Sequence, residues 1–515
     1  MSLLEYHNYK TRTLTLPNDF NDELYNNVPE DALIINFNFC SVFNNKIGHA
    51  DCEDVNCPHN LPNNLTRLTL GNRFNQTIDN LPSSLTNLTL GGDFDLPVDN
   101  LPKNLVYLEL GDDFDKPVNN LPETLLYLEF GSSFNRPIEN LPENLIHLTF
   151  GEYFNQLIGH QGCEDVNCPR NLPKSLINLK LNDHFNQLVD NLPINLKHLT
   201  LGLCFDQPVD NLPINLTYLV LGDSFNKSVD NLPKNLAYLV LGDSFNKSVD
   251  NLPKNLTNLT LGKQFNQSLE NLPKDILFLR LNDDFHNLNN LPNNITYLYL
   301  GDDFNKPIDE LPNSITKLHL GNKFNQSIDK LPTSLTELTL GLSFDKSVKN
   351  LPKTVTTLTL RRNIFYDYLP NSITKLSFGS CFNNPVGYQF LSKSLRNCLP
   401  KNLTHLCFGD GFNQNIDNLP DSIRQLTLGK NFNKKINKYP DSLFKLTIYS
   451  ESIQCQDIPL SVKILNIHFR KNSPDVTNIP PHIKKIRINN EYYLKNLKKI
   501  PFGCKVYDWS NVELI

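Results

Sequence analysis

The stretch LPNNLTRLTLGNRFNQTIDN, residues 61–80, decides the fold because it recurs along almost the whole chain. Related stretches begin about every twenty residues, from Leu81 onward to Tyr439, and most begin with Leu-Pro. About nineteen units follow the consensus L-P-x-x-L-x-x-L-x-L-G-x-x-F-N-x-x-[IV]-x-N. A fixed period of this length is typical of a solenoid, in which each repeat packs against its neighbours only.

Within one unit, the segment L-x-x-L-x-L predicts one short strand. Leu68 and Leu70 face one side of this strand, and Arg67 and Thr69 face the other, because side chains alternate along an extended backbone. Pro82, which opens the next unit, lacks a backbone N–H and favours an extended or polyproline-like return arm over a helix. The sequence therefore predicts a mainly β repeat solenoid with one short parallel strand per coil and little helix.

A glycine follows the predicted strand in most units. Gly71 can adopt a positive φ without steric cost, so the pattern predicts a left-handed turn at this point. Asn182 and Asn282 replace the glycine in two units, and asparagine is the next most tolerant residue of that conformation. The sequence therefore predicts a positive φ along this row.

Stacked units can bury apolar side chains that a single unit cannot. Leu65, Phe74 and Ile78 are expected to point inward, each over its equivalent in the next coil. The phenylalanine row continues to Phe412 and Phe432, forming a predicted spine. Two asparagine rows, one after the phenylalanine and one before Leu-Pro, are expected to satisfy backbone groups of the turns.

These residues resemble the FNIP repeat family, whose units carry the same leucine pattern followed by F-N-x-P-I. The closest matches are FNRPI at residues 134–138 and FNKPI at residues 304–308. The resemblance implies a fold like short leucine-rich repeats, although Phe74 and Asn75 lie beyond the usual asparagine position of that pattern. It also implies a source among social amoebae or the giant viruses of amoebae. Some relatives carry an F-box and are regarded as ubiquitin-ligase adaptors, and the family implies no catalytic residues.

The composition favours a non-enzymatic protein without a cofactor. The chain of 515 residues contains no G-x-S-x-G, P-loop or H-E-x-x-H motif. It has no run of eighteen apolar residues and no apolar leader, and its eleven cysteines are scattered, as expected of reduced thiols. We therefore predict a soluble cytoplasmic protein, located in the host cytoplasm if the chain is viral, with no membrane partner.

The repeats suggest three parts. Residues 1–60 read as an N-terminal cap with two degenerate repeats, residues 61–450 as tandem repeats, and residues 451–515 as degenerate repeats with a C-terminal cap. Loop insertions lie near residues 48–60, 159–171 and 387–398. Residues 430–515 contain fifteen Lys and Arg against seven Asp and Glu. This basic balance could attract nucleic acid, but a solvated cap is the favoured interpretation.

The first two insertions share the spacing H-x2-C-x4-C, which is compatible with weak zinc sites. The spacing matches no common zinc motif, so a copied surface loop without metal is the favoured interpretation. The candidate ligands are His49, Cys52, Cys57, His160, Cys163 and Cys168.

One outward row of the predicted strands is the candidate partner-binding surface. It lies one residue before the second leucine and is rich in tyrosine, which combines a rigid ring with a polar tip. Exposed strands also favour tyrosine without any partner. Three functions remain: a protein-interaction scaffold, possibly for host proteins; a ligase adaptor without its own F-box; and, less favoured, a nucleic-acid binder. The candidate residues are Tyr107, Tyr127, His147, His198, Tyr218, Tyr238, Phe278 and Tyr297.

Overall fold

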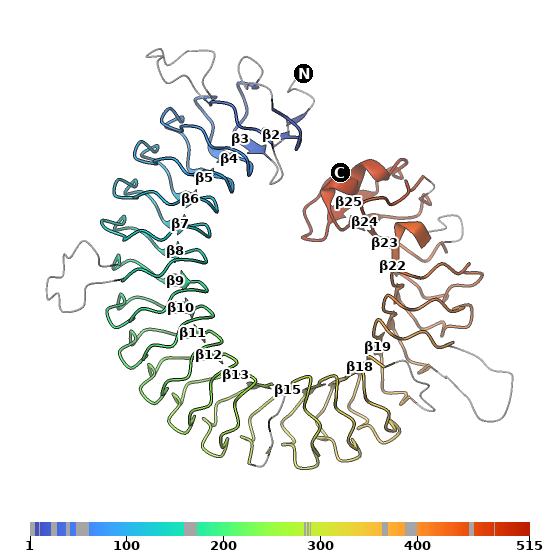
Figure 1. Cartoon of the computed structure of the whole chain (residues 1–515). Helices are drawn as coiled ribbons and strands as arrows, with labels where there is room; N and C mark the ends of the chain where they lie inside the picture. The colour runs from blue at the N-terminus through green and yellow to red at the C-terminus, as the bar shows by residue number, and fades with distance from the viewer. Residues whose placement is uncertain are drawn as a thin grey trace. The chain divides into compact units, whose positions relative to one another are not determined.

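The computed structural model is a repeat solenoid (Figure 1), and it describes residues 6–9, 11–21, 28–37, 42–47, 61–158, 172–282, 285, 288, 290–362, 369–386, 399–452, 458–477 and 479–515. The chain divides into two compact units, residues 1–276 and 277–515. Within each unit, successive coils contribute one short strand each to a parallel sheet. The described residues contain no α-helix. The predicted mainly β solenoid is confirmed.

Unit 1 contains thirteen strands in its described part. β2 to β13 pair in parallel with their chain neighbours. Their bounds are β1 (His7–Asn8), β2 (Thr13–Leu16), β3 (Ile34–Phe37), β4 (Arg67–Thr69), β5 (Asn87–Thr89), β6 (Tyr107–Glu109), β7 (Tyr127–Glu129), β8 (His147–Thr149), β9 (Asn178–Leu181), β10 (His198–Leu201), β11 (Tyr218–Leu221), β12 (Tyr238–Leu241) and β13 (Asn258–Leu261).

Unit 2 continues the same design with twelve strands in its described part. They also pair in parallel with their chain neighbours. The elements are β14 (Phe278–Leu281), β15 (Tyr297–Leu300), β16 (Lys317–Leu320), β17 (Glu337–Leu340), β18 (Thr357–Leu360), β19 (Lys375–Phe378), β20 (His405–Cys407), β21 (Gln425–Thr427), β22 (Lys445–Tyr449), β23 (Ile464–His468), β24 (Lys485–Ile488) and β25 (Lys505–Asp508), with 3-10 segments η2 (Ser450–Ser452) and η4 (Glu491–Asn496).

Two tight turns shape each coil. In the coil of residues 61–80, the N–H of Leu65 donates to the Pro62 carbonyl at 3.0 Å, and the N–H of Phe74 donates to the Gly71 carbonyl at 3.1 Å. Pro62 is the first residue of this turn and accepts through its carbonyl, so its missing N–H is not needed there. The same two hydrogen bonds recur in neighbouring coils, so the Leu-Pro and Gly-x-x-Phe segments mark the bends of the solenoid.

The phenylalanine spine lies where the sequence places it. Phe74, Phe94 and Phe114 are fully buried, and their ring centroids are 6.3 Å apart at interplanar angles of 5–8°. The row also extends further toward the N-terminus, because Phe20 and Phe43 stack in the same way. Wherever this position is described between Phe74 and Phe432, its phenylalanine is buried, so the predicted spine is confirmed.

The asparagine rows form hydrogen-bonded ladders at the surface and are not buried. Asn75 is exposed, and its Oδ1 accepts from the backbone N–H of Asp95 in the next coil at 3.1 Å. In the second row, Asn251 Nδ2 donates to Asp230 Oδ1 of the preceding coil at 3.1 Å. The first row satisfies backbone groups of the turns as predicted, whereas the second row bonds to aspartate side chains of the preceding coil instead.

The glycine row follows a different principle from the one predicted. Gly503 is the only glycine with a positive φ in the described part of the chain, and Asn182 does not adopt one either. The row is selected by close approach instead. A Cβ placed on Gly91 would lie 2.1 Å from the backbone oxygen of Gly71 in the preceding coil, and a Cβ on Gly242 would lie 2.3 Å from that of Gly222. The coils are too close here for a side chain that points along the stack.

Antiparallel segments cover both outer edge strands. β1 pairs antiparallel with β2 in unit 1. In unit 2, residues 512–515 turn back along β25, and the N–H of Leu514 donates to the Val506 carbonyl at 2.7 Å. An uncovered edge strand exposes hydrogen-bonding groups that recruit other chains, so these segments protect the sheets against edge-to-edge association.

Candidate functional site

The strand-face stripe consists of the outward residue that opens each strand, and in unit 1 it runs from Tyr107 to Tyr238. Parallel pairing places Tyr107 opposite Tyr127 and Tyr127 opposite His147, and the same alignment continues across β9 to β12. Phe278 and Tyr297 lie opposite each other in the same way in unit 2. The register therefore aligns the predicted residues of each unit into one row per sheet.

Members of the strand-face stripe pack against one another. The rings of Tyr127 and His147 stack with centroids 4.4 Å apart, as do those of Tyr218 and Tyr238. Asn178 Nδ2 lies 2.7 Å from His147 Nδ1, which links the next strand into the row. These contacts leave the rings half-buried or exposed, with ordered faces toward solvent.

In unit 1, the strand-face stripe contains two histidines, His147 and His198. Burial lowers the pKa of His147 from its ordinary value of 6.5, and the positive charge of His198 lowers it further. Both effects favour the neutral imidazole of His147, whose ring stacks on Tyr127.

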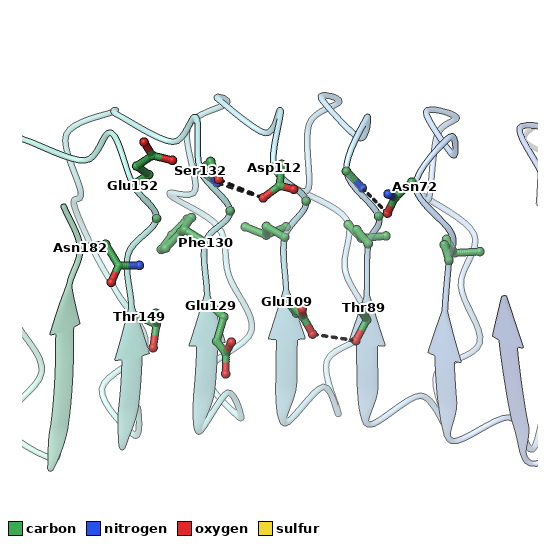
Figure 2. A pocket seen from close by; sticks show the side chains of 18 of the residues that line it. Asn72, Thr89, Glu109, Asp112, Glu129, Phe130, Ser132, Thr149, Glu152 and Asn182 are labelled. Carbon is green, nitrogen blue, oxygen red and sulfur yellow. Dashed lines mark hydrogen bonds between the residues drawn. The ribbon is translucent and has the colours of Figure 1, made fainter. Parts of the chain in front are cut away.

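An acidic groove of about 670 Å³ lies beside this stripe on β4 to β9 of unit 1. Two rows of side chains line it (Figure 2): the middle strand position and the turn that follows each strand. The strand row is Thr69, Thr89, Glu109, Glu129, Thr149 and Lys180, and the turn row is Asn72, Gly92, Asp112, Ser132, Glu152 and Asp183.

Two glutamates lie side by side in the floor of this groove. Glu109 and Glu129 are directly opposite in the parallel register of β6 and β7. Glu109 Oε2 accepts from the hydroxyls of Tyr107 at 3.0 Å and Thr89 at 3.2 Å. Glu129 accepts no hydrogen bond within the described part of the chain; burial and the Glu109 charge raise its pKa, against the opposing effect of Lys180. Like charges directly opposite each other on neighbouring strands repel, so placing Glu109 beside Glu129 lowers the stability of the fold.

Sequence reasoning selected the stripe and missed the groove. The sequence signal for the groove is a recurring Y-L-E segment, which reads YLEL at residues 107–110 and YLEF at residues 127–130. Glutamate stands twice in succession at a position that is otherwise mostly threonine in unit 1. In a parallel solenoid with a fixed period, equivalent positions of successive repeats become neighbours, so this repetition predicts two adjacent carboxylates.

The six candidate zinc ligands lie outside the described residues, at His49, Cys52, Cys57, His160, Cys163 and Cys168. Elsewhere, in the part of the chain that the structure describes, no group of three or more His, Cys, Asp or Glu side chains is arranged to hold a metal ion. The zinc sites, and the interpretation of these segments as copied loops, remain predictions.

Changing Cys52, Cys57, Cys163 and Cys168 together to serine is expected to leave the melting temperature unchanged, because loop residues without a metal contribute little to folding. Elemental analysis of the purified wild-type chain is expected to find no stoichiometric zinc. About two zinc ions per chain, one for each H-x2-C-x4-C segment, would contradict the interpretation as plain loops.

Among the described residues, no helix has the length and apolar character needed to cross a bilayer.

A family model described as FNIP Repeat matches eleven segments, residues 58–93, 93–133, 134–161, 169–204, 205–244, 245–284, 287–323, 308–343, 324–363, 364–411 and 412–450. No curated protein matches the chain.

Three solved structures are similar to this chain. CroV588, described as a novel circular LRR protein, is 30% identical with a TM-score of 0.52, and the alignment covers 96% of this chain and 95% of that one. YopM from Yersinia enterocolitica is 18% identical with a TM-score of 0.33, covering 87% of this chain and 88% of its own. A chain of the Toll–Spatzle complex from Drosophila is 13% identical with a TM-score of 0.43, and the alignment covers 96% of this chain and 80% of that one.

Proposed function

The chain belongs to the FNIP repeat family, and from that premise we propose that it is a non-enzymatic scaffold that binds protein partners through the strand face of its solenoid. Leucine-rich-repeat-like solenoids present extended surfaces and typically serve protein–protein interaction. The observation that carries the proposal is the strand-face stripe of unit 1, in which two pairs of rings on neighbouring strands stack, Tyr127 with His147 and Tyr218 with Tyr238.

This stripe has the properties of an interface anchor. Tyr218 and Tyr238 are fixed by their mutual stacking, so a partner would immobilise little additional side-chain freedom on binding. Tyrosine and histidine rings offer large apolar faces with polar edges, and such residues dominate the binding energy of many interfaces. The sheet beneath them is held by strand pairing in every coil, which keeps the row in one geometry.

The acidic row of the loops is less well suited to binding. Its members already accept hydrogen bonds from the asparagine row of the following coil at 3.0–3.2 Å. A partner at this surface would have to compete with the ladder that connects the coils. The residues concerned are Asp190, Asp210, Asp230 and Asp250.

The basic C-terminal region supports nucleic-acid binding less well than the stripe supports protein binding. Lys485 Nζ lies 3.7 Å above the Tyr507 ring, and Arg470 lies 4.7 Å above the Tyr449 ring. Lys505 forms an ion pair of 3.1 Å with Glu513. Several of these cations are thus engaged within the chain, which reduces the charge available to phosphates. An adaptor role in ubiquitin ligation is a narrower form of the scaffold function, and the partners retained would distinguish it.

The test replaces Tyr107, Tyr127, Tyr218 and Tyr238 together with serine and compares the proteins retained from an amoebal lysate. The variant is expected to lose partners that the wild-type chain retains, because aromatic anchors dominate interface energies. Its melting temperature is expected to fall by only a few degrees, since each stacked pair contributes about 0.5–1.5 kcal/mol.

The matched control removes two tyrosines that lie outside the stripe. Tyr153 is 48% exposed in a turn, and Tyr492 is 61% exposed in η4. The Y153S/Y492S variant is expected to retain the same partners as the wild-type chain. Unchanged retention by the quadruple variant would reject the strand-face stripe as the binding surface, and ligase subunits among the lost proteins would favour the adaptor role.

A further inference from the structure

The acidic groove of unit 1 carries more negative charge than its own residues compensate. Five carboxylate side chains line it, together with one amine, Lys180 at one end. The carboxylates are Glu109, Asp112, Glu129, Glu152 and Asp183.

Three of these carboxylates make no hydrogen bond and no ion pair within the described residues: Glu129, Glu152 and Asp183. The other two have neutral partners, as Figure 2 shows for Glu109 with Thr89 and for Asp112 with Ser132, the second at 3.1 Å. In contrast, the loop-side Asp206 of the same unit has its own lysine, Lys227, at 2.9 Å. The groove therefore has unused capacity to bind positive charge.

The shape of this charge distribution selects the kind of cation. The carboxylates belong to β6, β7 and the turns after β6, β8 and β9, so they are spread along the stack. No three acidic or other ligand side chains converge on one point in the described part of the chain, as a metal ion requires. A ligand with several separated positive charges matches this arrangement better than a point charge.

We propose that the acidic groove binds an extended segment of a partner protein that carries several lysine or arginine side chains, a proposal that rests on the protein-binding function proposed above. The groove crosses six strands, and its carboxylates lie on the last four, β6 to β9, over about 14 Å at about 4.8 Å per strand, which corresponds to roughly four residues of extended chain. Two or three lysine or arginine side chains at alternate positions, about 7 Å apart, would span this carboxylate-bearing part of the groove.

The neighbouring stripe adds to the selectivity. Tyr107 and Tyr127 open the strands whose middle residues are Glu109 and Glu129. Aromatic faces attract guanidinium and ammonium groups, more strongly when both are shielded from water. A basic side chain held by Glu129 could therefore also lie against a ring, which favours arginine or lysine over a neutral residue.

The test measures binding of a fluorescein-labelled peptide of about nine residues, alternating glycine and lysine, to the full chain by anisotropy. The E109Q/E129Q variant is expected to bind at least ~10-fold more weakly, because two charge partners are lost while the shape is kept. A second variant, E152Q/D183N, changes only the turn row and is expected to show a loss of the same order.

The control variant, D309N/E310Q, neutralises two exposed carboxylates of unit 2, so it removes the same formal charge without touching the groove. It is expected to bind the peptide within about twofold of the wild-type chain. Melting temperatures of all variants establish that each is folded. An equal loss in control and groove variants would mean a general charge effect and would overturn the proposal, as would undetectable peptide binding by the wild-type chain.

These outcomes are separable from those of the proposed function. If the tyrosine variant loses its protein partners while the groove variants retain them and the peptide does not bind, the strand face remains the binding surface and the groove proposal fails. If peptide binding depends on the groove glutamates but lysate partners are unaffected by the tyrosine variant, the aromatic stripe is rejected as the anchor.

Discussion

Replacing Phe245 with alanine is expected to lower the free energy of unfolding by about 3–5 kcal/mol. Phe245 is fully buried, and its ring centroid lies 6.0 Å from those of both Phe225 and Phe265, at interplanar angles of 7° and 1°. Truncation removes a ring from the middle of a stack. The hydrogen bonds of the sheet fix the spacing between adjacent coils, so the cavity left by the ring cannot close fully. The loss of stability therefore includes the cost of this cavity.

The control for this prediction is Asp243→Ala, two residues earlier in the same turn. Asp243 is partly exposed and pairs with Lys263 at 2.7 Å, and an ion pair at the surface contributes about 0–1 kcal/mol. Urea unfolding followed by circular dichroism compares the two variants with the wild-type chain. If both variants lose the same stability, the phenylalanine spine contributes less to the free energy of unfolding than its burial implies.

The spine was predictable from sequence because repetition multiplies one observation. A single Phe74 could face solvent or the core, but a phenylalanine at every period of about twenty residues must be stacked if the coils are stacked. The same argument gave the parallel strands and the alignment of Tyr107 with Tyr127, since equivalent positions become neighbours. These features depend only on the period and on the alternation of side chains along a strand.

Other features depend on distances between coils, which the sequence does not contain. One coil alone predicts that backbone conformation selects glycine in the Gly71 row, because a positive φ is the usual reason for a repeated turn glycine. The structure has no positive φ there, and the constraint comes from the preceding coil. A rule read from one coil cannot reveal a clash between two.

The candidate site was predictable in part: its position in the sequence was, and its side-chain contacts were not. The period identified the row of Tyr107 and His147, but their stacking and partial burial follow from side-chain rotamers that a consensus does not specify. The acidic groove depends on Glu129 remaining without a partner while Glu109 has two, a difference between neighbouring repeats with similar sequences. Individual repeats therefore carry the functional differences, whereas the consensus carries the fold.

Gly91 and Gly92 offer a direct test of the close-approach principle, because they are adjacent and differ in what a methyl group would meet. The methyl group of Gly91→Ala would lie 2.1 Å from the Gly71 backbone oxygen and 2.3 Å from its carbonyl carbon. These are backbone atoms of the preceding coil and cannot rotate away. The coils must separate locally, so we expect a loss of about 1–3 kcal/mol, as for overpacked cores.

Gly92→Ala is expected to be neutral or to stabilise the protein by up to about 1 kcal/mol, because alanine restricts the unfolded chain. Its methyl group would approach nothing nearer than the Asn72 side chain at 3.6 Å, an ordinary contact, and Gly92 has no positive φ. Urea midpoints for the two variants decide the question. If a positive φ were the constraint on this row, the stability lost in Gly91→Ala would come from the backbone of Gly91 itself. The distance to the preceding coil would then have no effect. If coil spacing controls it, Gly91→Ala must fall below wild type while its immediate neighbour does not, and equal midpoints for the two variants would refute that explanation.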